Sequence, residues 1–210
     1  MPEFDANEIF YGNYEDAMSR LSEIEQFAEY MGLYLKKEAT YFREEAHVDL
    51  EIEFLPLFAE TFPPILHSSL IISTAILAEL EMRGYAATLR KAHGLDLGLN
   101  DLSGSILERF RAYVGKLAHL PLDWSRARWD DLVGSFEIRN CLVHSGGSLK
   151  EFARANVILA FASRHGTPEC TTGNLKISEK TAKLILQVTT AFIEEIYEAA
   201  IRALPGKHNL

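Results

Sequence analysis

The sequence predicts an all-α fold, a bundle of about five or six helices. Glycine and proline residues cluster at only a few points, and the segments between them carry apolar residues at alternating spacings of three and four. The chain shows no internal repeat and no low-complexity tract. We expect one compact unit, in which an N-terminal helical extension (residues 1–58) packs on a helical domain (residues 59–210).

Three helices are predicted in the first half of the chain. A narrow apolar seam predicts an amphipathic helix from about Tyr14 to Phe54. A proline pair can open a second helix, from about Pro64 to Ala92, and its nearly unbroken apolar centre predicts the most buried helix of the fold. A third helix is expected from Leu102 to Leu120, with Asn100 or Asp101 as its N-cap.

The C-terminal part is predicted to contain two more helices, besides the one that holds the motif described below. Residues from Leu149 to Arg164 have a helical pattern. The stretch from His165 to Ile177 is rich in turn-forming residues and predicts a loop or a small hairpin. Ser178 is expected to cap a final amphipathic helix that fades near Pro205.

The charge of the chain is acidic and unevenly distributed. The net charge of −9 argues against a protein that coats nucleic acid, because phosphate binding depends on positive potential. Residues 1–82 hold 17 acidic and 4 basic residues, whereas residues 83–128 hold 8 basic and 4 acidic residues. The mildly basic segment is compatible with a small RNA-contacting cleft, and equally with a solvated surface of mixed charge.

Several features point to the cytoplasm as the expected location. The acidic N-terminus has no apolar core of a secretory signal. The longest apolar run, Leu70 to Ala78, is too short to span a bilayer. Cys141 and Cys170 form neither a disulfide framework nor a zinc site, and Glu44-x-x-His47 is only one of the two motifs that a di-iron bundle needs. We therefore expect no metal and no cofactor.

The most informative segment runs from Phe136 to Gly147. It places a permanent cation (Arg139), an amide (Asn140) and a titratable imidazole (His144) within six residues, and then stops with a glycine pair. Arginine binds phosphate through a planar, bidentate fork, and histidine can give or take a proton near neutral pH. Metal-free cleavage of an RNA phosphodiester needs these groups.

A helix is the expected setting of this segment, capped by Asp130 or Asp131 and ended by the glycine pair. On a regular helix, residues four apart are offset by about 40° and residues five apart by about 140°. His144 therefore shares a face with Asn140 and points away from Arg139. A two-fold dimer of motif helices could bring arginine and histidine into one cleft.

Arg139-Asn140-x-x-x-His144 resembles the signature of the HEPN family, helical domains that include many metal-independent ribonucleases. The resemblance covers roughly residues 60–200. It implies a toxin or phage-defence endoribonuclease that cleaves RNA to 2′,3′-cyclic phosphate ends at a site shared by a homodimer. An antitoxin or regulatory protein would be a further partner. Some HEPN toxins carry a modifiable tyrosine two residues after the histidine, where this chain has Gly146, so that mode of control is in doubt.

The resemblance also assigns roles to the motif residues. His144 would act as general base or general acid, Arg139 would bind the phosphate, and Asn140 would orient His144 or the substrate. Three alternatives stay open. Arg139 could pair with a core carboxylate while His144 caps the helix end; the domain could be an inactive HEPN-like module that binds protein or RNA; or the chain could be an unrelated bundle.

Overall fold

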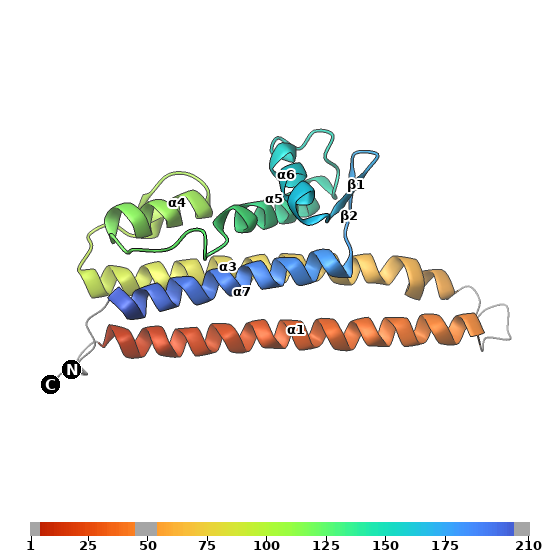
Figure 1. The fold of residues 1–210 in the computed structure, drawn as a ribbon, viewed down its shortest axis with the longest axis horizontal. Helices are drawn as coiled ribbons and strands as arrows, with labels where there is room; N and C mark the ends of the chain where they lie inside the picture. The colour runs from red at the N-terminus through yellow and green to blue at the C-terminus, as the bar shows by residue number, and fades with distance from the viewer. Residues whose placement is uncertain (1–4, 45–53, 204–210) are drawn as a thin grey trace. The chain divides into compact units, whose positions relative to one another are not determined.

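A computed structural model of the chain describes residues 5–44 and 54–203. It is 77% helical, with six α-helices and a single two-stranded hairpin in the described part, which confirms the all-α prediction (Figure 1). The elements, in chain order, are α1 (Ala6–Glu44), the π-helical turn η1 (Leu57–Thr61), α3 (Phe62–His93), the 3-10 turn η2 (Leu99–Asp101), α4 (Ile106–Ala112), the π-helical turn η3 (Tyr113–Leu117), α5 (Trp129–Ser145), α6 (Ala155–His165), β1 (Glu169–Thr171), β2 (Asn174–Lys176) and α7 (Glu179–Ala203).

The first helix begins earlier than the seam predicts. Asp5 accepts a hydrogen bond from the backbone N–H of Glu8 at 3.3 Å, so α1 starts at Ala6 instead of near Tyr14. Phe10 is fully buried and extends the apolar seam toward the N-terminus. The far end of the predicted helix, residues 45–53, lies outside the described residues.

The predicted N-cap of the third helix is wrong. Ser105 caps α4 through a reciprocal pair of bonds: Ser105 N–H donates to Glu108 Oε2 at 2.8 Å, and Glu108 N–H donates to Ser105 Oγ at 3.3 Å. Asp101 instead accepts from Gly98 N–H at 2.7 Å and closes the turn η2. The capping residue thus lies four positions beyond Asp101 and five beyond Asn100, the two expected caps.

Two other helix starts differ from prediction. The motif helix α5 begins at Trp129, so Asp130 and Asp131 lie in its first turn instead of capping it. α6 begins at Ala155 instead of Leu149, because the preceding residues are tied to the hairpin. Leu149 N–H donates to Gly173 O at 2.8 Å, and Ser148 forms a β-bridge with Asn174. The predicted small hairpin and the Ser178 cap are confirmed.

The chain divides into two compact units, and the boundary between them falls within α1, α3, α5 and α7. The first unit contains residues 1–20, 75–133 and 188–210, and the second contains residues 21–74 and 134–187. Residues 1–58 therefore contribute to both units, and the expected N-terminal extension stays a prediction.

Each unit has its own core. In the first, Phe10 packs against Tyr85 and Tyr197, with ring centroids 5.1 and 6.1 Å away, and Tyr85 donates to Ile196 O at 2.7 Å. The core of the second unit joins α3, α5, α6 and α7. Its buried apolar side chains are Leu70, Ile71, Ile138, Cys141, Ile158, Phe161, Ile177, Ala182 and Ile185.

The stretch Leu57–His93 is long and apolar enough to cross a membrane, judged by length and composition alone. About one third of its most apolar window is buried inside the structure. Core helices pass the same test, so this single helix is weak evidence for membrane insertion.

Candidate functional site

The predicted site residues lie on α5, within its last two turns. The helix ends as the glycine pair predicts. Gly147 N–H donates to Cys141 O at 3.1 Å, and Gly146 and Gly147 have φ values of +56° and +84°. This bond closes a seven-residue turn, and both left-handed positions within it favour glycine. Arg139 and His144 are thereby held on a helix that stops directly after them.

Arg139, Asn140, Val143 and His144 together form the solvent-facing side of these turns. Arg139 and Asn140 are half-buried, whereas Val143 and His144 are exposed. Ile138 and Cys141, on the other side of the helix, are fully buried in the core of the second unit. The sequence motif is therefore presented outward, and its spacer residues anchor the helix.

Arg139 and Asn140 are linked directly. Arg139 Nη1 donates to Asn140 Oδ1 at 3.0 Å. No carboxylate in residues 5–44 or 54–203 forms an ion pair with Arg139. Within the same ranges, the His144 ring has no hydrogen-bond partner, and the backbone of the glycine pair closes the helix end. These contacts do not support the alternative in which Arg139 pairs with a core carboxylate and His144 caps the helix.

The structure brings Arg139 and Asn140 together, but it does not bring Arg139 and His144 together. Five residues of α-helix separate the directions of their side chains by about 140°. Val143, which is 46% exposed, lies between them on the same face. A single copy of α5 thus offers a cationic edge and an imidazole edge, separated by an apolar side chain.

Contacts with α6 hold α5 in position. Gly134 lies so close to Phe161 that an added Cβ would come within 2.5 Å of its ring. Glu137 is 5% exposed, and its Oε1 forms an ion pair with Arg154 Nη1 at 2.9 Å. Sequence reasoning missed both contacts. Glu137, an acid inside an apolar run, was the one available hint that a cation must approach that side of the helix.

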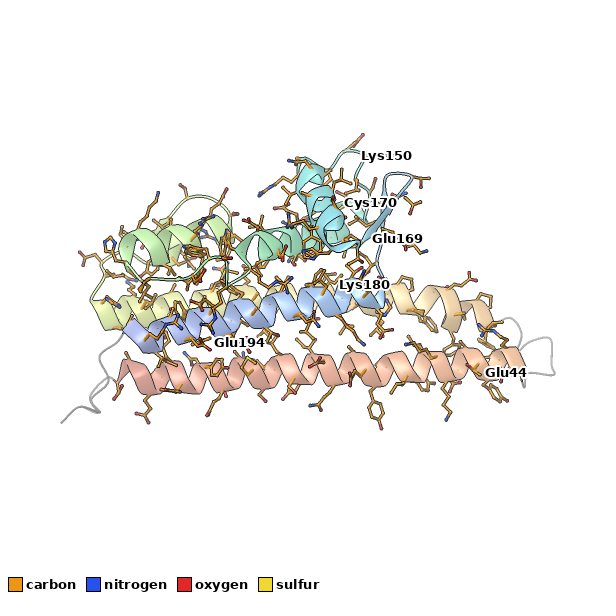
Figure 2. The ribbon with its side chains drawn as sticks, in the orientation of Figure 1. Glu44, Lys150, Glu169, Cys170, Lys180 and Glu194 are labelled. Carbon is orange, nitrogen blue, oxygen red and sulfur yellow. The ribbon has the colours of Figure 1, made fainter. Side chains whose placement is uncertain are left out.

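No cluster of three or more histidine, cysteine, aspartate or glutamate side chains suited to a metal ion occurs in the described part of the chain. Of the Glu44-x-x-His47 pair, His47 lies outside it. Both cysteines are free thiols. Cys141 is buried and donates to Ser148 O at 3.4 Å, whereas Cys170 lies exposed on the hairpin (Figure 2). Burial raises the pKa of both thiols, which makes them weak nucleophiles near neutral pH.

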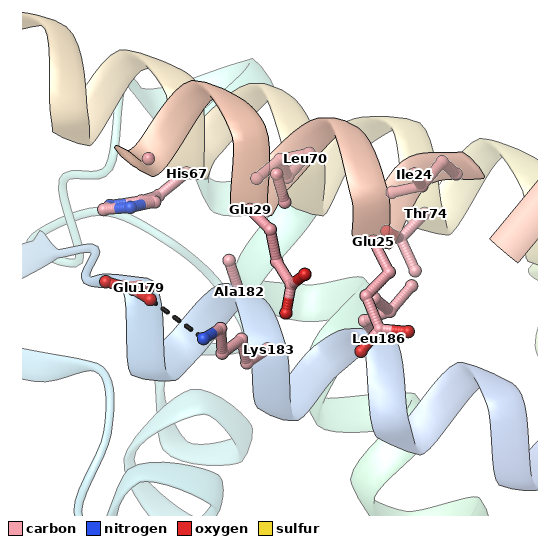
Figure 3. Close-up of a pocket in the computed structure, with 12 residues that line it drawn as sticks. Ile24, Glu25, Glu29, His67, Leu70, Thr74, Glu179, Ala182, Lys183 and Leu186 are labelled. Atoms are coloured by element: carbon pink, nitrogen blue, oxygen red, sulfur yellow. Dashed lines mark ion pairs between the residues drawn. The ribbon is translucent and has the colours of Figure 1, made fainter. Parts of the chain in front are cut away.

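A second polar cluster occurs in the same unit, beside a small cavity between α1, α3 and α7 (Figure 3). Glu179 accepts from Lys36 at 3.0 Å and from Lys183 at 2.9 Å. The buried His67 Nδ1 has no hydrogen-bond partner in the described structure, and burial lowers the pKa of the ring. Sequence spacing could not reveal this cluster, because Lys36, His67 and Glu179 are 31 to 143 positions apart along the chain.

The cavity itself is too small for a substrate. Its volume of about 30 Å³ has room for little more than a water molecule, which could hydrogen-bond the unpartnered His67 nitrogen. Its walls are mainly apolar, with Ile24, Leu70 and Leu186 among them (Figure 3). A more open hollow of about 360 Å³ adjoins the cluster and is lined by Lys36, His67 and Glu179, but Lys36 and Glu179 are already paired with each other. Arg139 forms no ion pair within the described residues, so we regard α5 as the stronger candidate for the functional site.

Comparisons with protein-family models, with curated proteins and with solved structures find no match for this chain. The function is therefore inferred from the residues of α5 and from their chemistry.

Proposed function

We propose that the chain is a metal-independent endoribonuclease of the HEPN type, a toxin or phage-defence protein that acts in the cytoplasm as a homodimer. The observation that carries the proposal is the outward face of α5. There Arg139, Asn140 and His144 of the Arg-Asn-x-x-x-His motif share an accessible surface at the helix end.

The chemistry of each residue supports this function. His144 can take the proton of the ribose 2′-hydroxyl, whose oxygen then attacks the adjacent phosphorus. The 5′-oxygen leaves with a proton from an imidazolium, and a 2′,3′-cyclic phosphate remains. Arg139 can bind the phosphate through two N–H groups and stabilise the charge that builds on its oxygens. Attack by the 2′-hydroxyl restricts the reaction to RNA.

A homodimer resolves the divergence of Arg139 and His144. If two α5 helices meet around a two-fold axis, the arginine of one copy can face the histidine of the other. Val143 supports this arrangement, because an exposed apolar side chain between the two functional groups can be buried at the contact. The two His144 residues could then divide the base and acid roles.

The alternative is a catalytically inactive HEPN-like domain that binds protein or RNA. One observation favours it: the Asn140 amide accepts from Arg139 and not from His144, so no contact in the described structure orients the imidazole. A binding module needs only the accessible cation and the apolar neighbour. An antitoxin or other regulatory protein is a suitable partner for either function.

Cleavage of single-stranded RNA in EDTA tests the proposal. The wild-type protein should produce 2′,3′-cyclic phosphate ends, or the 3′-phosphates derived from them, and should leave DNA intact. Arg139→Ala and His144→Ala should each lower the rate at least about a hundredfold while remaining folded. Arg43→Ala and His93→Ala replace exposed residues of the same two types outside α5 and serve as matched controls.

The possible outcomes separate the two functions. A requirement for magnesium, equal cleavage of DNA, or wild-type rates in both α5 variants would contradict the ribonuclease. RNA binding without cleavage, weakened by Arg139→Ala but not by Arg43→Ala, would support the inactive binding module.

A further inference from the structure

The outer side of α1 exposes a run of large apolar side chains within the second unit. Phe27 is 55% exposed, Tyr30 80%, Leu33 67% and Tyr34 48%. In Figure 2, side chains project from α1 on the side opposite α7. We call these four residues the outer stripe of α1. An apolar surface of this kind is more often a contact surface than a solvated face.

The outer stripe is distinct from the seam that α1 uses to pack within the chain. Leu21, Leu35 and Ala39 are buried, with exposed fractions of 3%, 6% and 8%. With about 100° per residue, these three lie within about 40° of one another, whereas Tyr30 lies about 140° or more from each. The helix therefore has two apolar faces. On the outer stripe, the Tyr34 ring also approaches the Phe58 ring, with centroids 6.4 Å apart, whereas Phe27, Tyr30 and Leu33 remain more than half exposed.

Two charged residues flank the outer stripe. Glu23 and Lys37 each lie seven residues from Tyr30, on opposite sides, and seven residues return a helix to nearly the same face. Both are exposed, and neither forms an ion pair in the described part of the chain. Along this helix face an acid (Glu23) is followed by the apolar stripe and then by a base (Lys37). A second copy of the helix, placed antiparallel, therefore sets its base beside the acid and its acid beside the base.

We infer that the outer stripe binds a second copy of this chain, with two α1 helices packed antiparallel around a two-fold axis at Tyr30. This axis places Tyr30 against Tyr30 of the second copy, and Phe27 at the same level as Leu33. It also places each Glu23 beside a Lys37, so that both ends of the contact close with an ion pair. A partner helix that lacks this order of charges could pair with Glu23 or with Lys37, but not with both.

The inference is independent of the proposed function, because it concerns a different helix face from the motif of α5. A contact at Tyr30 and a contact at α5 are each two-fold and can coexist in one larger assembly. The test must therefore report on position, and not only on the number of chains in the particle.

Cysteine cross-linking at the axis provides such a test. In a Cys170→Ser background, which removes the exposed thiol, Tyr30→Cys should form a disulfide-linked dimer on mild oxidation. Its two copies face each other, within the distance that a disulfide can bridge. Gln26→Cys is the matched control. Its two copies would be offset by eight residues, about 12 Å along the helix, which is too far to bridge.

Charge reversal tests the predicted partners of the same contact. Lys37→Glu should weaken self-association about tenfold or more, because it places two acids together at both ends. Adding Glu23→Lys should restore association, since the order of charges is then inverted but still self-complementary. Circular dichroism should show unchanged helix content, because Glu23 and Lys37 are both exposed.

The outcomes are exclusive. Efficient linking through Tyr30→Cys with little through Gln26→Cys, together with rescue by the double reversal, supports the antiparallel contact. Equal linking at both positions, no linking at Tyr30→Cys, or no rescue by the second reversal would overturn it. A different protein that occupies the stripe would also appear as an absence of linked dimers.

Discussion

Arg139 Nη1 and Asn140 Oδ1 are 3.0 Å apart, so two consecutive residues of α5 are linked side chain to side chain. The amide oxygen occupies one N–H group of a guanidinium that has five, and it adds no charge. The remaining donors are available to a phosphate. The asparagine therefore orients the cation without neutralising it.

Asn140→Asp should weaken RNA cleavage or binding by more than tenfold, because a carboxylate at this place would neutralise the guanidinium. Asn140→Ala should have a smaller effect, since it removes orientation but leaves the charge. Binding and cleavage measured at several salt concentrations would separate the two variants. If Asn140→Asp behaves like Asn140→Ala, Arg139 does not contact phosphate.

Mixing two inactive variants should restore activity if the site is shared. Arg139→Ala keeps His144, and His144→Ala keeps Arg139, so a mixed dimer contains one arginine and one histidine in the same cleft. The mixture should cleave RNA faster than either variant alone, in a ratio-dependent manner. A rate equal to the mean of the two parents would indicate that Arg139 and His144 act within one chain, that the cleft needs both copies of His144, or that neither residue acts.

The sequence predicted the placement of the motif more accurately than the starts of several helices. The glycine pair after His144 has one physical use, a left-handed helix end, and the structure uses it so. Several residues could cap α4, by contrast, and the choice depended on whether a glutamate lay three positions later. Ser105 has Glu108 there, and Asn100 has Ser103.

Contacts between distant segments were beyond prediction from one sequence. Leu149 continues a helical pattern, yet its backbone binds Gly173 in the hairpin, and this pairing overrides the local propensity. The cluster of Lys36, His67 and Glu179 is likewise assembled from three separate helices. Periodicity describes the face of one helix but not the neighbour that this face meets.

Gly134→Ala should destabilise the protein by about 1–3 kcal/mol, because its Cβ would overlap the Phe161 ring, which is itself buried. Gly32→Ala is the matched control within a helix. Nothing lies within 4 Å of its added Cβ, so alanine should stabilise by about 0.5–1 kcal/mol through helix propensity. Urea unfolding of both variants measures the difference. Equal effects would show that α5 and α6 do not pack as closely as described.

Ser105→Ala should destabilise α4 by about 1 kcal/mol, since it removes the oxygen that accepts from Glu108 N–H. Ser103→Ala, two residues earlier and outside the helix, is the control and should have little effect. Hydrogen exchange at Leu107 and Glu108 would detect fraying of the first turn. Protection unchanged by Ser105→Ala would contradict the assigned cap.

The stability of the second unit should depend on the charge of Glu179. Hydrogen bonds from Lys183 and Lys36 lower the pKa of this carboxyl from 4.5 to about 2. Since the folded state holds the proton less tightly than the unfolded state, the stabilisation is complete above pH 4.5. It is lost as the pH falls toward 2.

Glu179→Gln should therefore be less stable than wild type by about 0.5–1 kcal/mol at pH 7, a small amount because the pair is partly exposed. The difference should shrink steadily below pH 4.5 and vanish near pH 2, as measured by urea unfolding across this range. Glu151→Gln replaces an exposed glutamate that has no ion pair within the described residues, and it should leave the free energy of unfolding unchanged. A Glu179→Gln difference that stays constant from pH 7 to pH 2.5 would show that the two lysines do not stabilise the ionised carboxyl in the folded protein.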